Sequence, residues 1–274
     1  MRVSVHSFSF HPMIRAGTMD LFGSLETVRY RYGLRCADIW DLALASRNTS
    51  YIHAVRRALM EREMELISLN VSSYWLWDAD PGVRNYNERL VPAYLRIAEA
   101  LGAQTVCVDA GGHVSGEAFT PREFDYMVTL YRQYAQRAYD NGYRIGPENH
   151  YGAEALPQEM LRLCKAVDHP GFGMLLHVGR WQGDDASRGD AMLAPWVMHV
   201  HLDDNLTHGE LVESMTRLRD ADYDGAWSVE VERDGTYAQV GAMVARIERV
   251  LERWRLESAQ AMRPAQVRGG IAGR

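Results

Sequence analysis

Residues 121–148 read PREFDYMVTLYRQYAQRAYDNGYRIGPE, and this stretch contains the unit from which the whole chain is built. Residues 121–139 have the apolar spacing of an amphipathic helix, and Asn141 with Gly142 is typical of a helix end. The apolar run at 143–148 that follows predicts a strand. A helix that leads into a short apolar strand is part of the βαβ unit from which parallel sheets are made.

The same alternation repeats in both directions from this stretch. Further helical patterns occupy 25–32, 51–63 and 90–101, and Gly102 ends the last of them. Strands are predicted at 2–10, 35–40, 65–71, 104–109, 143–148, 173–178, 197–202 and 227–231. Eight strands that mostly alternate with helices over about 240 residues predict a single-domain (β/α)8 TIM barrel. A doubly wound sheet is disfavoured because no strand is followed by G-x-G-x-x-G.

Composition narrows the class of protein further. The chain of 274 residues has a net charge of −6, which disfavours nucleic-acid binding because that binding relies on clustered Lys and Arg. It has no run of 18 apolar residues and no secretory signal, so we expect a cytoplasmic protein without a membrane span. The three cysteines lie in apolar runs and indicate no disulfide framework. The one lysine, Lys165, lies in the helical stretch before the sixth strand, which removes Schiff-base chemistry.

Ionisable residues gather near the C-terminal ends of the last four strands, where barrels of this type place their active sites. They are Glu148, His177, His201 and Glu230, separated by 29, 24 and 29 residues. Each interval is about one βα unit, so the four residues take equivalent positions on successive strands. Nitrogen and oxygen donors of this kind suit Mn²⁺, Fe²⁺, Co²⁺ or Zn²⁺. Taken singly, each residue is better explained as a hydrogen-bonded structural group, and it is their joint recurrence that favours a metal site.

A divalent cation at this position would polarise a carbonyl group and stabilise an enediolate while a carboxylate or histidine moves the proton. The pattern therefore favours proton abstraction beside a carbonyl. Other catalytic motifs are missing from the sequence: it contains no P-loop, no G-x-S-x-G, no H-E-x-x-H and no C-x-x-C pair.

Three segments resemble the xylose-isomerase-like TIM barrels, which include sugar-phosphate isomerases and epimerases. The segments are IGPENH at 145–150, HVHLDDN at 199–205 and YDGAWSVEVE at 223–232, and the resemblance covers about residues 1–255. Members of that superfamily bind one metal through Glu, Asp, His and Glu from the fifth to eighth strands. Glu148, His201 and Glu230 match the first, third and fourth of these ligands. The resemblance implies a divalent metal cofactor, with Mn²⁺ as the first choice.

The second ligand position departs from the family pattern. Members read Asp-x-Gly-His or similar after the sixth strand, whereas this chain has HVGR at 177–180. The imidazole of His177 can still act as a ligand, which gives a two-His, two-Glu site; the alternative is a site without metal. Arg180 replaces the histidine that handles the substrate in the family. It is expected either to bind a substrate carboxylate or enolate, or to form a salt bridge with Asp184 or Asp185.

The resemblance also implies catalytic roles. In epimerases of this family the ligand pair that corresponds to Glu148 and Glu230 works as acid and base across the sugar. His150 lies two residues beyond Glu148 on the same strand face. Dehydratase and C-glycoside-cleaving members have an equivalent Glu-x-His pair, which implies proton transfer by His150. The alternative is a histidine at the rim of the site that bonds to a loop.

Three further residues are candidates for substrate binding. His6 on the first strand is expected at the mouth of the pocket, and Asp109 at the end of the fourth strand is expected to bind a hydroxyl group. Trp75 belongs to SYWLW at 73–77, which is predicted to follow the third strand and to offer a wall for a sugar or an aromatic aglycone. Such aromatic residues also serve as packing or as a subunit contact.

The sequence thus predicts a divalent-metal-dependent isomerase or epimerase of a sugar or related polyhydroxy carbonyl compound, with a role in carbohydrate metabolism. A lyase or dehydratase that eliminates a β-leaving group is the alternative, because elimination begins with the same proton abstraction. A third interpretation is a barrel that binds a ligand without turnover. The expected partner is a small sugar-like molecule, with no nucleic acid or membrane, and a homo-oligomer is compatible with this. Residues 1–257 are expected to form the barrel, and 258–274 a C-terminal extension that is flexible or contacts a partner.

Overall fold

The structure, a computed structural model, describes residues 2–111 and 118–261. Its eight strands form one sheet, and all the hydrogen-bonded neighbours are parallel. The strands are β1 (Arg2–His6), β2 (Cys36–Trp40), β3 (Glu65–Trp77), β4 (Thr105–Gly111), β5 (Arg144–Gly146), β6 (Met174–His177), β7 (Val197–Leu202) and β8 (Ala226–Val229).

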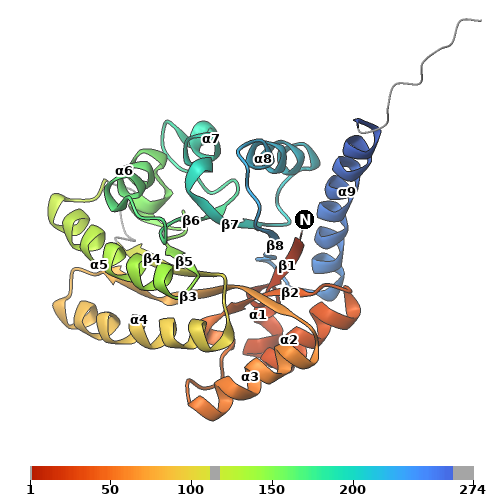
Figure 1. Cartoon of the computed structure of the whole chain (residues 1–274), viewed down its shortest axis with the longest axis horizontal. Helices are drawn as coiled ribbons and strands as arrows, with labels where there is room; N and C mark the ends of the chain where they lie inside the picture. The colour runs from red at the N-terminus through yellow and green to blue at the C-terminus, as the bar shows by residue number, and fades with distance from the viewer. Residues whose placement is uncertain (1, 112–117, 262–274) are drawn as a thin grey trace, which may run out of the picture.

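The strands are arranged in the order β5-β4-β3-β2-β1-β8-β7-β6, so β1 pairs with both β2 and β8. The two ends of this order, β5 and β6, are joined by parallel bridges from Ile145 to Phe172 and from Glu148 to Leu175. The sheet therefore curves round into a nearly closed barrel. Figure 1 shows the helices arranged around the strands. The predicted (β/α)8 TIM barrel is confirmed.

Close backbone approach at the β5–β6 seam depends on glycine. The N–H of Ile145 donates to the carbonyl of Gly171 at 2.9 Å, and the N–H of Gly173 donates to the carbonyl of Ile145 at 3.1 Å. A Cβ atom on Gly146 would lie 1.6 Å from the carbonyl oxygen of Gly173, so no larger residue fits there. Because Glu148 follows two residues later, this packing also sets the position of the first candidate site residue.

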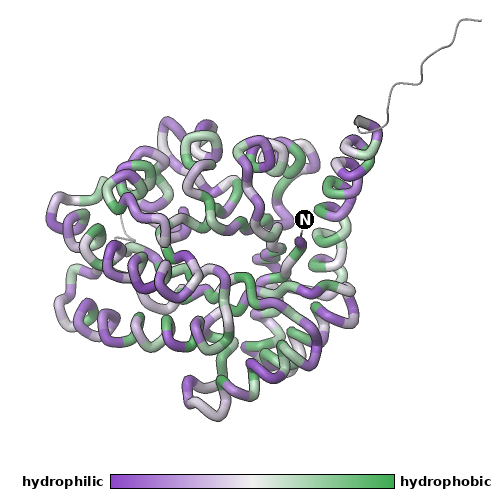
Figure 2. The backbone as a smooth tube through the Cα atoms, in the orientation of Figure 1, coloured by the Kyte–Doolittle hydropathy of each residue, from purple (hydrophilic) through white to green (hydrophobic). Residues whose placement is uncertain are grey.

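Helices cover the outside of the barrel. They are α1 (His11–Arg15), α2 (Leu21–Glu26), α3 (Thr49–Glu61), α4 (Pro81–Leu101), α5 (Pro121–Asp140), α6 (Pro157–Val167), α7 (Gly189–Leu193), α8 (His208–Asp220) and α9 (Tyr237–Ala261). Short 3-10 or π-helical turns complete the chain: η1 (Ser7–Phe10), η2 (Thr27–Arg31), η3 (Asp41–Ala43), η4 (Gly152–Ala155), η5 (Ala186–Arg188) and η6 (Ala194–Trp196). In Figure 2 hydrophobic residues follow the strands and alternate with hydrophilic ones around the helices, as amphipathic packing requires.

Several predicted strand boundaries were wrong. The strands β5 and β8 each end two residues earlier than predicted, before Glu148 and Glu230. The first strand ends at His6, because the next four residues form η1 instead of extending to residue 10. The SYWLW segment at 73–77 does not follow β3 but is its final part. A register shift between Val71 and Trp75 lets the strand continue, so that Trp75 pairs with Asp109 on β4.

One predicted helix begins earlier than its periodicity indicated. The pattern placed its start near residue 90, whereas α4 begins at Pro81. The side chain of Asp80 accepts a hydrogen bond from the N–H of Gly82, and Pro81 occupies the first turn, where its missing N–H costs nothing. The helix ends at Gly102 in a left-handed conformation, as the sequence predicted.

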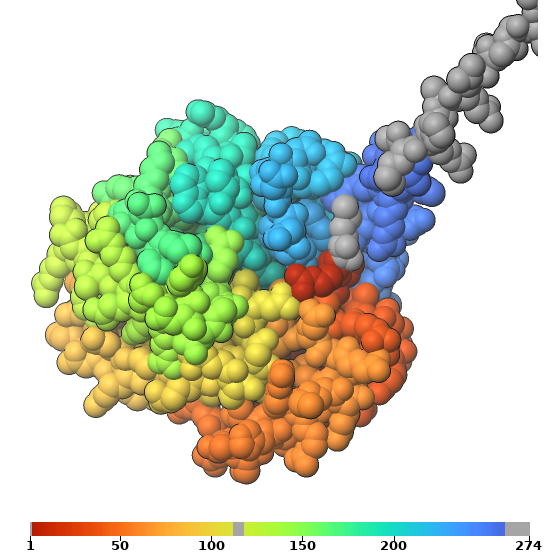
Figure 3. All heavy atoms as spheres, viewed as in Figure 1, coloured from red at the N-terminus to blue at the C-terminus, as the bar shows by residue number. Residues whose placement is uncertain are grey.

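The first and last parts of the described chain lie side by side. Figure 3 shows the N-terminal residues in red against the blue of α9, in agreement with the pairing of β1 and β8. The α9 helix continues to Ala261, and residues 262–274 of the predicted C-terminal extension lie outside the described residues. Among the described helices, none is both long enough and apolar enough to span a membrane.

Candidate metal centre

Four acidic and histidine side chains converge at the C-terminal end of the barrel. Glu148 follows β5, His177 ends β6, His201 lies in β7 and Glu230 follows β8. One ligand atom from each residue lies within 4.8 Å of the others, and all four residues are buried. The residues that the sequence grouped as metal ligands therefore meet in space. They meet because equivalent positions on successive parallel strands lie at the same end of a barrel.

Short contacts connect these four side chains. Nδ1 of His177 lies 2.9 Å from Oε1 of Glu148. Nδ1 of His201 lies 2.5 Å from Oε2 of Glu230 and 3.6 Å from Oε1 of Glu148. Despite this proximity, Nδ1 of His201 is buried without a hydrogen bond of good geometry. A buried nitrogen in this state is costly unless it has another partner.

The donor set fits a divalent transition metal. Two imidazole nitrogens and two carboxylate oxygens are ligands that Mn²⁺, Fe²⁺, Co²⁺ and Zn²⁺ accept, whereas Mg²⁺ and Ca²⁺ favour oxygen donors alone. The buried Nδ1 of His201, which lies close to two carboxylates and has no hydrogen bond of good geometry, is suited to act as a ligand atom.

The opposite charges of the cluster shift the pKa values of its carboxylates and histidines. Burial would raise the pKa of Glu148, but His150 and the neighbouring imidazoles hold it well below the usual value. Burial would likewise raise the pKa of Glu230, which His201 and His6 hold well below its usual value. Burial would lower the pKa of His201, but the carboxylates of Glu230 and Glu148 raise it to about 10. In the metal-free protein the two glutamates are therefore ionised at neutral pH and His201 is protonated.

We expect metal binding to release a proton and to strengthen as the pH rises. A cation must displace the proton that His201 carries below about pH 10. The apparent affinity for Mn²⁺ should therefore increase by about tenfold per pH unit between about pH 6 and pH 9. Isothermal titration calorimetry in buffers of different ionisation enthalpy counts the released protons. The variant His53→Gln, on an exposed position of α3, should behave like the wild type; an affinity that does not change with pH would contradict the expectation.

Two asparagines contact the two histidines that are candidate ligands. Asn149 clamps the backbone of His177, because its Oδ1 accepts from the N–H at 2.7 Å and its Nδ2 donates to the carbonyl at 3.0 Å. Nδ2 of Asn70 lies 3.4 Å from Nε2 of His201. The sequence analysis missed both residues. Asn70 could have been found in the sequence as a polar amide inside an apolar strand. Asn149 could have been found because it directly follows the candidate ligand Glu148.

A second polar network lies one layer deeper in the barrel. Nε2 of His199 lies 2.9 Å from Oδ2 of Asp38, and both side chains are wholly buried. The same oxygen accepts hydrogen bonds from the hydroxyls of Ser4, at 3.2 Å, and Ser228. The ring of His199 packs edge-on against His201 with their centroids 5.4 Å apart. The network therefore fixes the position of a candidate ligand from below.

Glu148 and Glu230 line a cavity of 480 Å³, whereas His177 and His201 are fully buried and are not part of its lining. We call it the catalytic cavity, and its polar lining includes His6, Asp109, Glu148, His150, Arg180 and Glu230. Nδ1 of His6 lies 3.0 Å from Oε2 of Glu230, and Nδ1 of His150 lies 3.7 Å from Oδ2 of Asp109. Burial would lower the pKa of His150, but the charges of Glu148 and Asp109 raise it. The two carboxylates therefore favour the protonated form of His150.

Comparison with known proteins identifies the family of the chain. A family model described as xylose isomerase-like TIM barrel matches residues 30–256. The chain belongs to the xylose isomerase-like TIM barrel family. A search of curated proteins found no match to the sequence.

Solved structures share the xylose isomerase-like fold at low sequence identity. An L-ribulose 3-epimerase superposes with a TM-score of 0.75 at 13% identity, covering 97% of this chain and 99% of that chain. The probable 3-DHS dehydratase AsbF from Bacillus anthracis gives 0.71 at 16% identity, covering 90% and 99%. The 3-keto-D-glucoside 4-epimerase YcjR from E. coli gives 0.71 at 16% identity, covering 92% and 99%. At these identities the likeness establishes the fold.

Arg180, at the position where the family has a histidine, pairs with Glu232 at the rim of the catalytic cavity. The expected partners Asp184 and Asp185 were wrong, because the barrel brings the end of β8 beside the loop after β6. Asp185 instead pairs with Arg188. A substrate carboxylate would have to compete with Glu232 for the guanidinium group.

The structure also places Trp75 and Lys165, two residues whose roles the sequence analysis considered. Trp75 does not line the catalytic cavity but an adjoining pocket of 220 Å³. Lys165 is exposed on the outside of the barrel in α6, so the interpretation that excludes Schiff-base chemistry agrees with its position.

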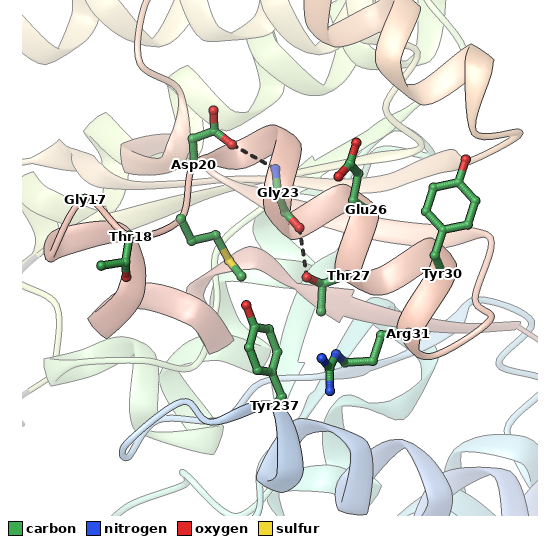
Figure 4. Close-up of a pocket in the computed structure, with 10 residues that line it drawn as sticks. Gly17, Thr18, Asp20, Gly23, Glu26, Thr27, Tyr30, Arg31 and Tyr237 are labelled. Carbon is green, nitrogen blue, oxygen red and sulfur yellow. Dashed lines mark hydrogen bonds between the residues drawn. The ribbon is translucent and has the colours of Figure 1, made fainter.

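A larger hollow of 920 Å³ lies away from the strand ends, between α2, η2 and the start of α9. Figure 4 shows its lining, with Asp20 accepting from the N–H of Gly23 at 2.8 Å. Its charged groups have partners: Glu26 pairs with Arg62, and Arg31 stacks on the ring of Tyr237. Among the described residues, none of the clustered metal-ligand groups lies here. In a xylose isomerase-like barrel this hollow is therefore not the catalytic site.

Proposed function

We propose that this protein is a divalent-metal-dependent isomerase or epimerase of a sugar or related polyhydroxy carbonyl compound. One observation carries the proposal: two ionised carboxylates and two imidazoles converge at the C-terminal end of the barrel, and both carboxylates line one cavity. The fold shared with sugar epimerases supports it.

Glu148, His177, His201 and Glu230 would hold the metal, with Mn²⁺ as the first choice. When bound, a divalent cation supplies a Lewis acid that polarises the carbonyl oxygen of a substrate. The adjacent carboxylates of Glu148 and Glu230 provide the proton transfer. Because their pKa values are held low, both are ionised at neutral pH and one is ready to accept the proton beside the carbonyl.

Epimerisation requires a proton to leave one face of a carbon and return to the other. Glu148 and Glu230 come from different strands, β5 and β8, so they approach the catalytic cavity from different directions. His6 lies 3.0 Å from Glu230 and orients that carboxylate. Asp109 and the Arg180–Glu232 pair supply polar contacts for substrate hydroxyl or carboxylate groups.

A lyase of the dehydratase type is the second candidate, and His150 is the observation that favours it. Elimination needs an acid to protonate the leaving group after the proton beside the carbonyl is removed. His150 lines the catalytic cavity and has a buried Nδ1 without a hydrogen bond, and the charges of Glu148 and Asp109 outweigh burial and raise its pKa. A probable dehydratase with the same fold is consistent with this second candidate.

The test is solvent proton exchange. Mn²⁺-loaded protein is incubated with a panel of ketoses and keto-sugars in D₂O and followed by NMR and mass spectrometry. An isomerase or epimerase incorporates deuterium beside the carbonyl, whereas a lyase gives a product that is lighter by one water and absorbs in the ultraviolet. Less than about 0.2 equivalents of metal after loading would sink the metal-dependent proposal. Tight binding without exchange or product would favour the third interpretation, a ligand-binding barrel.

The proposal also covers the cellular location, the metabolic role and the partner of the protein. We infer a cytoplasmic role in carbohydrate metabolism with a small sugar-like partner, supported by three cysteines that are all free and buried. We also retain the division into a barrel at residues 1–257 and an extension at 258–274.

A further inference from the structure

A smaller pocket adjoins the catalytic cavity on the side of β3 and β4. We call this 220 Å³ pocket the aromatic chamber, and its lining is Ser72, Trp75, Asp109, Gly111, Tyr151 and Glu154. Three of these residues, Ser72, Asp109 and Tyr151, also line the catalytic cavity. The two spaces are therefore neighbouring parts of one binding region.

Aromatic rings form the side walls of the chamber. The indole N–H of Trp75 donates to Oδ2 of Asp78 at 3.0 Å, which fixes the ring and directs its polar atom into the protein. The ring of Tyr151 stacks on His150 with their centroids 3.7 Å apart. Gly111 lies in the wall at φ 103°, and a Cβ there would lie 2.1 Å from the carbonyl oxygen of Trp77, so this wall carries no side chain.

Two polar groups of the chamber, Ser72 and Glu154, bond to the protein, whereas Asp109 is shared with the catalytic cavity. The hydroxyl of Ser72 accepts from the indole N–H of Trp40 at 2.8 Å. The carboxyl group of Glu154 accepts from the backbone N–H groups of Ala110 and, at 3.2 Å, Gly111. The surface that remains is mostly apolar. A sugar hydroxyl placed in the chamber away from Asp109 would lose its water without gaining an equivalent partner, which disfavours a fully hydroxylated chain in this position.

The size of the chamber fits one ring. An apolar cavity of about 150 Å³ is large enough to bind benzene, so 220 Å³ accommodates a six-membered aromatic ring with its linking atom. We propose that the substrate carries an aromatic or comparable planar apolar group, and that this group lies between Trp75 and Tyr151 while the polyhydroxylated part occupies the catalytic cavity. The inference rests on the proposed function for the polyhydroxylated part only.

The experiment compares phenyl β-D-glucopyranoside with methyl β-D-glucopyranoside, two probes that differ only in the group meant for the chamber. Their Kd values are measured on the full chain with and without Mn²⁺ by ligand-observed NMR. We expect the phenyl glycoside to bind about tenfold more tightly or better, because a buried ring gains that much from leaving water. Trp75→Ala should reduce the ratio to about one and leave the Kd of the methyl glycoside unchanged.

Three further variants make the result specific. Trp75→Phe keeps an aromatic face and should retain most of the ratio, and Tyr151→Ala, at a half-exposed position, should lower it. Tyr139→Ala removes an exposed ring on the far end of α5 and should change nothing. A ratio near one in the wild type, or a ratio that survives both Trp75→Ala and Tyr151→Ala, overturns the inference.

Failure of the proposed function gives a different result. If neither glycoside binds, phenol alone is titrated against the wild type and Trp75→Ala. Binding of phenol that depends on Trp75 supports the chamber and counts against a sugar site beside it. No binding of phenol overturns the chamber itself.

Discussion

Replacing Glu230 with Gln is expected to remove most of the bound Mn²⁺ and to lower turnover by about 10³-fold or more. Glu230 contributes one of the two ionised carboxylates of the centre, and its Oε2 lies 2.5 Å from Nδ1 of His201 and 3.0 Å from Nδ1 of His6. A neutral amide keeps the shape of the side chain but removes the negative charge and the proton acceptor. Elemental analysis after loading and the rate of deuterium exchange measure the two effects separately.

The matched control is Glu65→Gln. Glu65 is exposed and pairs with Arg2 at 2.9 Å on the outer surface, so this variant makes the same chemical change away from the centre. It should retain full metal content and activity. Glu148→Gln should behave like Glu230→Gln, because both carboxylates belong to one cluster. Normal metal content in both Glu148→Gln and Glu230→Gln would contradict the assignment of the centre.

The variant Asp38→Asn is expected to lower the free energy of unfolding by about 3 to 5 kcal/mol. Asp38 is wholly buried. Its Oδ2 lies close to Nε2 of His199 and accepts hydrogen bonds from the hydroxyls of Ser4 and Ser228. An amide cannot accept all of these contacts and leaves the buried imidazole without its carboxylate partner. Urea unfolding followed by circular dichroism measures the loss. Glu65→Gln again serves as the control, because an exposed ion pair contributes only about 0 to 1 kcal/mol.

The effect of Asp38→Asn should depend on pH in a defined direction. Burial would raise the pKa of Asp38, but His199 outweighs burial and the pKa falls to about 2. A carboxyl group with a lowered pKa stabilises the fold above its unfolded pKa of about 3.9, and this contribution is lost as the pH falls toward about 2. The difference between wild type and variant should therefore be constant above about pH 5 and shrink below about pH 4. A difference under about 1 kcal/mol at neutral pH would contradict the role of the network.

Much of the fold was predictable because it rests on local patterns. The helix pattern at 121–139 became α5, and the eight predicted strands all appear, since apolar periodicity and turn residues act within a few positions of the chain. The boundaries that failed depended on longer-range effects. SYWLW continued β3 because a register shift allowed pairing with β4, which no local pattern reveals.

The candidate site divides in the same way. The sequence by itself determined the barrel and the four residues that recur at the ends of successive strands, because one βα repeat separates each from the next. Only the tertiary structure decided what surrounds them. Asp38 contacts Ser228 and His6 contacts Glu230 across 190 and 224 residues, and Arg180 meets Glu232 instead of its sequence neighbours. The contacts of Asp38 and His6 exist because closing the sheet places the first strands beside the last. Periodicity along one chain specifies which residues face the centre of a barrel, but their partners are specified only when the barrel closes.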